Sequence, residues 1–141
     1  MIKINEHSLL FMVVCMILSG FASTMNNWIN KLDDFRFSLN DVYMTGLMTG
    51  WMIFFMGLFT LEIRKIVIGL ITILVFFGLI RTQLFVSEIQ FLRGMIPHHS
   101  MAVMMSKRLE KKPNRIQHLL DQIIQTQEKE IVIMKNYLGE L

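Results

Sequence analysis

Two adjacent histidines and four methionines fall within eleven residues of the chain, in the stretch MIPHHSMAVMM at positions 95–105. The imidazole nitrogens of His98 and His99 and the methionine thioether sulfurs are donors that favour copper, above all Cu(I), over magnesium or calcium. The same residue types also have an ordinary structural use, because methionines fill helical cores and a histidine on an apolar face is commonly held by a hydrogen bond. The stretch therefore predicts either a soft-metal site or a methionine-rich helical core.

The histidines lie in a helix that we predict to begin after Ser87, where Ser87-x-x-Gln90 has the form of a capping box. We expect this helix to run to about residue 109, with a kink where Pro97 lacks a backbone donor. A turn follows, and a last helix is expected over 113–138, because proline suits a first helical position and Gly139 is a stop signal. The end of the chain is therefore predicted to be a helical hairpin.

The predicted hairpin brings polar residues of the last helix opposite the histidines. At 100° per residue, Met95 and His99 lie on the apolar stripe of the first helix, and His98 lies on its flank. Gln127 and Glu130 interrupt the apolar face of the second helix at the matching height. These groups either surround a metal ion or form a structural hydrogen bond, with Glu130 holding one of the histidines in place.

Three apolar stretches precede the hairpin, and each is about as long as the 20 residues that a helix needs to cross a bilayer. The predicted spans are about 8–24, 42–61 and 66–86. The short link between the second and third spans requires an antiparallel pair. We therefore predict a membrane domain over residues 1–86 and a helical hairpin domain over residues 87–141.

Two features of the spans leave alternatives open. The first span also has the form of a signal peptide, although the two spans that follow favour an uncleaved anchor. In the second span, methionines recur every four residues and glycines lie on the opposite side, which suggests either close helix packing through the glycines or a thioether ladder that passes Cu(I). These residues are Met44, Met48, Met52 and Met56, with Gly46, Gly50 and Gly57.

Composition excludes several classes of function. The net charge is only +3 over 141 residues, and no basic stripe with interleaved aromatic residues occurs, so we expect no nucleic-acid partner. The chain has no Glu-x-x-His, His-Glu-x-x-His or Gly-x-Ser-x-Gly motif, so we expect no enzyme. The rival to metal binding is a helical interaction or oligomerisation module whose histidines are structural.

The run FLRGMIPHHSMAVMMSKRL, followed by IIQTQEKEIVIMKNYL, resembles the bacterial family catalogued as domain of unknown function three-oh-five, over about residues 86–139. Members resemble ferritin-like helical bundles, and the CopM-like members bind copper or silver in the periplasm. The three preceding spans resemble a membrane-anchored subgroup. The metal ligands that this resemblance implies are Met95, His98, His99, Met101 or Met105, Glu130 and Met134, with Gln127 in support.

Together these features predict an all-α protein, with three transmembrane helices followed by a ferritin-like two-helix hairpin that a second copy completes to a four-helix bundle. The resemblance and the anchor-like start imply a multi-pass protein of the bacterial inner membrane with a periplasmic hairpin. We expect it to bind copper, as Cu(I), or silver for metal tolerance or homeostasis, with membrane lipid and a second copy as partners. Helix geometry favours His99 over His98 as the stronger ligand.

Overall fold

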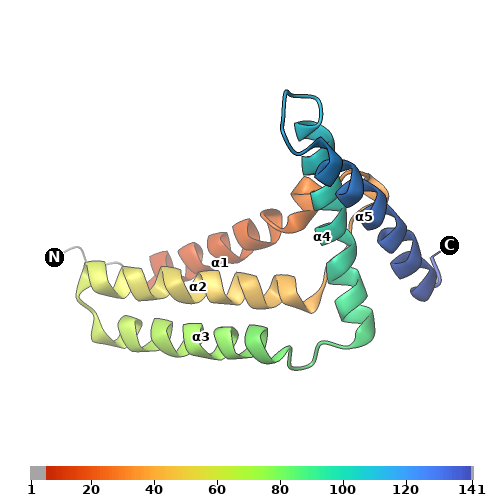
Figure 1. The fold of residues 1–141 in the computed structure, drawn as a ribbon. Coiled ribbons are helices and arrows are strands. Elements are labelled where there is room, and N and C mark those ends of the chain that lie inside the picture. The colour runs from red at the N-terminus through yellow and green to blue at the C-terminus, as the bar shows by residue number, and fades with distance from the viewer. Residues whose placement is uncertain (1–5, 141) are drawn as a thin grey trace. The chain divides into compact units, whose positions relative to one another are not determined.

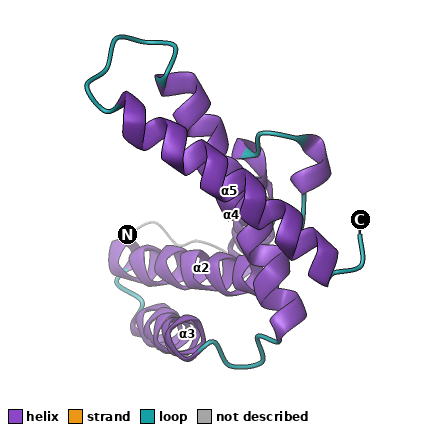
Figure 2. Cartoon of the chain, turned by 45° about the vertical axis from the view of Figure 1, so that its right-hand side comes forward, coloured by secondary structure: helices purple, strands orange, loops and turns teal. Residues whose placement is uncertain are grey.

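The computed structural model describes residues 6–140, and every regular element in that range is a helix (Figures 1 and 2). These residues form two compact units. One contains the residues up to Thr24 together with Leu39–Phe85, and the other contains Met25–Ser38 together with the residues from Val86 onward. Residues 25–38 thus lie inside the predicted membrane domain in sequence but pack with the hairpin in space.

The first unit consists of three helices that are long and apolar enough to cross a membrane. The candidate spans are Ser8–Trp28, Leu39–Thr60 and Ile63–Thr82, and the last four residues of the first span belong to the second unit. The helices of the first unit are α1 (Glu6–Ala22), which makes up most of the first span, α2 (Leu39–Thr60) and α3 (Ile63–Thr82). The prediction of three such helices is confirmed, but the expected end of the third span at residue 86 was too late. Helix α3 ends at Thr82 because Gln83 adopts a left-handed conformation with φ of 51°.

Helices α2 and α3 form the expected antiparallel hairpin, and glycines allow their backbones to approach closely. A Cβ atom on Gly57 would lie 2.6 Å from the backbone nitrogen of Ile66, and one on Gly69 would lie 2.4 Å from that of Phe54. Gly46 likewise faces the α3 side chains. The interpretation that the glycine side of the second span packs against a neighbouring helix is therefore confirmed.

The second unit is built on α4 (Glu88–Leu109) and α5 (Gln117–Tyr137), which pack against each other and appear as a crossed pair in Figure 2. The cap of α4 is as predicted, since the Ser87 side chain accepts a hydrogen bond from the Gln90 backbone nitrogen. Pro97 lies inside α4. The core between the two helices contains Ile96, Ile131 and Met134.

The predicted start of the last helix at residue 113 was wrong, because α5 begins at Gln117. The side chain of Asn114 holds the preceding turn in a non-helical form. Its Oδ1 accepts a hydrogen bond of 3.0 Å from the backbone nitrogen of Ile116, and its Nδ2 donates one of 3.0 Å to the carbonyl of Lys112. An asparagine that bonds its own neighbouring backbone competes with helix formation in this way.

The segment between α1 and α2 completes the second unit. It contains two short 3₁₀ helices, η1 (Met25–Trp28) and η2 (Leu32–Asp34), and both pack on α4. We call residues 25–38 the docked loop. Its side chains pack with the hairpin although they come from an earlier part of the chain.

Candidate metal site

His99 is buried in the hairpin, and both of its ring nitrogens have partners. Its Nδ1 lies 2.9 Å from the carbonyl oxygen of Met95, one turn earlier in α4, and its Nε2 lies 2.9 Å from Glu130 Oε2 on α5. The structure therefore brings together the histidine and the carboxylate that the hairpin was expected to juxtapose. A ring with both nitrogens engaged offers a metal no free lone pair unless Glu130 is displaced.

His98 is exposed and points to a different partner, as expected for adjacent residues on a helix. Its Nδ1 lies 3.2 Å from the sulfur of Met25, the first residue of η1 in the docked loop. Among the residues that the structure describes, no hydrogen-bond partner is found for its Nε2. An imidazole nitrogen and a thioether sulfur thus meet at the surface, with one further nitrogen open to solvent.

The separation of these two donors suits a shared metal ion. With bond lengths of about 2.0 Å to nitrogen and about 2.3 Å to sulfur, as in zinc sites, two ligands at a trigonal or tetrahedral ion lie about 3.5 Å apart. The observed 3.2 Å between His98 Nδ1 and Met25 Sδ needs only a small rotation of either side chain to reach that value.

The remaining predicted ligands do not converge on this point. Met95 and Met134 pack in the hydrophobic core around Ile131. Met105 is exposed and lines a surface pocket beside Trp28, far along α4 from the histidines. Met95 and Met134 therefore pack in the core and Met105 lies at the surface, and a metal role for them stays a prediction.

Two further predicted ligands, Met101 and Gln127, are half-buried. Met101 follows His98 by three residues and so lies one helical turn away on a neighbouring part of the surface. The side-chain oxygen of Gln127 is buried and accepts no hydrogen bond within the described part of the chain. Met101 is therefore the predicted ligand best placed to join His98.

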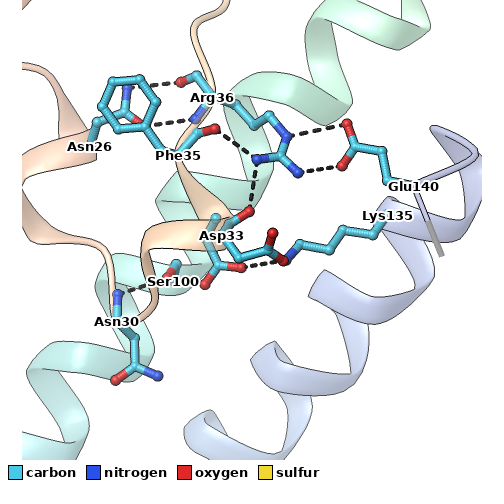
Figure 3. Close-up of polar contacts among 9 residues, drawn as sticks. Asn26, Asn30, Asp33, Phe35, Arg36, Ser100, Lys135 and Glu140 are labelled. Carbon is cyan, nitrogen blue, oxygen red and sulfur yellow. Dashed lines mark hydrogen bonds and ion pairs between the residues drawn. The ribbon is translucent and has the colours of Figure 1, made fainter.

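The docked loop is held on the hairpin by a partly buried polar cluster, which Figure 3 shows. The hydroxyl of Ser100, which is fully buried, donates a hydrogen bond of 2.5 Å to Asp34 Oδ2 and accepts one of 2.8 Å from the backbone nitrogen of Asn30. Lys135 of α5 forms ion pairs with Asp34, at 2.8 Å, and with Asp33. We call the contacts among Asp33, Asp34, Ser100 and Lys135 the loop clasp.

Charge in the loop clasp shifts two pKa values. Lys135 donates a hydrogen bond to Asp33 and adds its positive charge, and both effects lower the pKa of that carboxyl below its ordinary 3.8. Burial by itself lowers the pKa of Lys135, but the hydrogen bonds and charges of Asp33 and Asp34 outweigh it and raise the pKa above 10.5. Asp33 and Lys135 are therefore both charged throughout the range in which an imidazole titrates.

A second set of contacts ties the end of the docked loop to the end of α5. The guanidinium of Arg36 pairs with the carboxylate of Glu140 through two nitrogens, as Figure 3 shows. The side chain of Asn26, next to Met25, donates to the carbonyl of Arg36 at 2.8 Å and accepts from its backbone nitrogen at 3.0 Å. Asn26, next to Met25 at the start of the docked loop, is thus tied to the end of the loop.

Comparison with known proteins gives two matches. Residues 79–138, which take in α4 and α5, match the family described as Domain of unknown function (DUF305). The chain is also 40% identical over 143 residues to uncharacterized protein L153 of Acanthamoeba polyphaga mimivirus, and the match covers 96% of this chain and 94% of the viral one. The chain belongs to the DUF305 family. No solved structure matches it.

The DUF305 segment includes His98 but leaves out Met25, which lies more than fifty residues before it. Met25 was not among the ligands predicted from the sequence, because helical spacing relates only residues that lie on the same helix. The available signal was a methionine directly after a predicted span, at the start of a polar loop.

Proposed function

We propose that this DUF305 protein binds a soft metal ion, Cu(I) or Ag(I), on a helical hairpin that three transmembrane helices attach to a membrane. It acts as a binding protein for metal tolerance or homeostasis and carries out no catalysis. The observation that supports the proposal is the 3.2 Å contact between His98 Nδ1 and Met25 Sδ.

The choice of metal follows from the donors available. Among the residues the structure describes, no three His, Cys, Asp or Glu side chains gather into a group that could hold a metal. This favours a site that uses thioether sulfur, which zinc, magnesium and calcium bind weakly and Cu(I) binds well. His98 and Met25 supply two donors, and Met101, one turn along α4, is the third that we propose.

In this proposal the two histidines have different roles. His98 binds the metal, because one of its nitrogens contacts only a sulfur and the other is open. His99 holds α4 and α5 in register through Glu130, at 2.9 Å. This order is the reverse of the one that helix geometry alone favoured, since both nitrogens of His99 are already used.

We place the protein in the bacterial inner membrane, with the second unit in the periplasm. The first helix resembles a signal anchor, and three spans then carry the chain to the non-cytoplasmic side. The CopM-like proteins that the hairpin resembles bind copper or silver in the periplasm, and this resemblance supports the proposed orientation.

A second copy is proposed to complete a ferritin-like four-helix bundle. Val132 and Ile133 of α5 are about half exposed, and they line an apolar surface groove together with Gln125 and Lys129. An uncovered apolar face of this kind on a two-helix hairpin is commonly covered by a partner helix pair.

Elemental analysis of protein purified from copper-fed cells tests the function. We expect bound copper in the wild type, and a loss of one copper ion per chain in the variant His98→Ala. The variant Met105→Leu is the matched control, because Met105 is exposed on the same helix and lies about two turns from His98. Equal copper in all three proteins would instead favour the rival function.

That rival is a helical interaction module whose histidines are structural, and the doubly bonded His99 favours it. A comparison of two histidine variants distinguishes the two functions. If the module is correct, His99→Ala weakens self-association while His98→Ala leaves both self-association and metal content unchanged.

A further inference from the structure

A groove lined by methionines lies in the membrane unit, between α1 and α2. It has a volume of about 540 Å³, and its lining is entirely apolar. Two of its methionines come from α1 and three from α2, and the rest of the lining is aromatic. We call it the methionine groove, and its methionines are Met12, Met16, Met48, Met52 and Met56.

The groove differs from the single-helix ladder that the sequence suggested. Met44, the first residue of that ladder, does not line the groove and is 50% exposed. Met12 and Met16 of α1 take its place, one turn apart, opposite the three α2 methionines. The α2 methionines repeat every four residues and so extend over about 12 Å of the helix. Sulfur atoms therefore lie on two facing helices and not only along one.

The donor chemistry of the groove selects a narrow class of ligand. Thioether sulfur is neutral and soft, so it replaces the hydration of Cu(I) or Ag(I) but not that of Mg²⁺, Ca²⁺ or Zn²⁺. A single positive charge also costs much less to desolvate than a double one. The rings of Trp51 and Phe55, which stack with centroids 5.6 Å apart, line the same groove, and aromatic rings attract cations.

We propose that the methionine groove is a second metal site, which binds one soft monovalent ion, Cu(I) or Ag(I), through thioether ligands from both α1 and α2. This site lies in a different unit from His98 and does not depend on the hairpin site. The proposal commits to the ion as occupant, because five thioethers facing one groove supply donors that a lipid chain does not use.

Silver binding to the full-length protein in detergent tests the proposal, with Ag(I) as the probe. The starting protein carries Met25→Leu and His98→Ala, so that loss of the hairpin site cannot be mistaken for loss of the groove. We expect it to retain one tightly bound silver ion per chain. Adding Met16→Leu and Met52→Leu should weaken that binding by about 10- to 100-fold. Adding Met44→Leu, a methionine of α2 outside the groove, should leave it unchanged.

A second measurement needs no groove variant. Peroxide oxidises exposed methionines to sulfoxides, and bound metal protects its sulfur ligands. In the wild type, silver should slow the oxidation of Met16 and Met52, followed by mass spectrometry, and should not slow that of Met44. Because thioethers carry no proton, this protection should be equal at pH 7 and pH 5.

The proposal is overturned if the starting protein binds no silver, or if Met16→Leu with Met52→Leu binds silver as well as Met44→Leu does. Equal protection of Met44 and Met52 would overturn it too. The groove would then be a packing surface for a lipid chain or for a helix of a second copy.

Discussion

At the scale of single residues, the two histidines are neighbours on α4 but contact different partners. His99 points into the hairpin and is satisfied by Glu130 at 2.9 Å and by a backbone carbonyl. His98 points outward to Met25. Helical spacing predicted that Glu130 would lie opposite the histidines, but it did not decide between His98 and His99. It could not predict Met25, which reaches His98 only through a loop 73 residues away.

The loop clasp gives the first prediction. Replacing Asp34, which is 2% exposed, by alanine leaves the buried ammonium of Lys135 with one exposed partner. Loss of one partner of a buried ion pair typically costs about 3 to 5 kcal/mol, so Asp34→Ala should release the docked loop. Hydrogen exchange of residues 25–38 should speed up strongly. Asp33→Ala is the control, because the Asp33 side chain is 78% exposed and its loss should change exchange little.

The second prediction concerns pH. The pKa of Asp33 is lowered, so its contribution to the clasp is present above about pH 4 and is lost only as the pH falls through its folded value. The pKa of Lys135 is raised, so its contribution is complete below about pH 10.5 and is lost only above that. Between pH 7 and pH 5 the ion pair between Asp33 and Lys135 should therefore be constant.

Metal binding should respond in that same window. A metal-binding imidazole must be neutral, so protons compete with the metal ion for its nitrogen. Cu(I) binding at the hairpin should weaken from pH 7 to pH 5 while hydrogen exchange of the docked loop stays unchanged. If exchange rises together with the loss of copper, the pH effect comes from the clasp and not from His98.

At the scale of elements, the pairing of α2 with α3 gives the third prediction. An added Cβ on Gly69 would lie 2.4 Å from a backbone nitrogen of α2, so the helices must move apart in Gly69→Ala. Overpacking of this kind costs about 1 to 3 kcal/mol, measured as a lower thermal unfolding midpoint in detergent. Gly78→Ala is a matched control on the same helix, since nothing lies within 4 Å of that position. Equal midpoints for the two variants would contradict the packing described.

The elements also show which parts of the fold are readable from sequence. The three apolar helices and the Ser87 cap follow from local composition and spacing, and all were predicted. The start of α5 was not, because Asn114 competes with the helix through its own side chain. The docked loop was not either, because it is held by contacts such as Ser100 with Asp34, which are 66 residues apart in sequence.

At the scale of the whole molecule, a chain with an uncovered apolar face on α5 should self-associate. Ile133 is 52% exposed beside Val132, and a charge there would have to be desolvated at the proposed dimer contact. Ile133→Lys should therefore shift the protein from dimer to monomer in detergent, as measured by mass photometry. Ile133→Leu keeps the face apolar and should stay dimeric. A wild type that is monomeric at micromolar concentration would contradict the proposed four-helix bundle.

The proposed hairpin site requires Met25 and His98 to bind one soft ion together. A competition titration against a Cu(I) chelator tests it most directly, with the wild type, Met25→Leu, His98→Ala and the double variant. Each single change should weaken Cu(I) by about 10-fold or more, and the double variant should lose little beyond the larger single effect, because either loss opens the same site. Met25→Leu should affect Zn(II) less than Cu(I), since only the soft ion favours sulfur. Four proteins that compete for Cu(I) equally would contradict the claim.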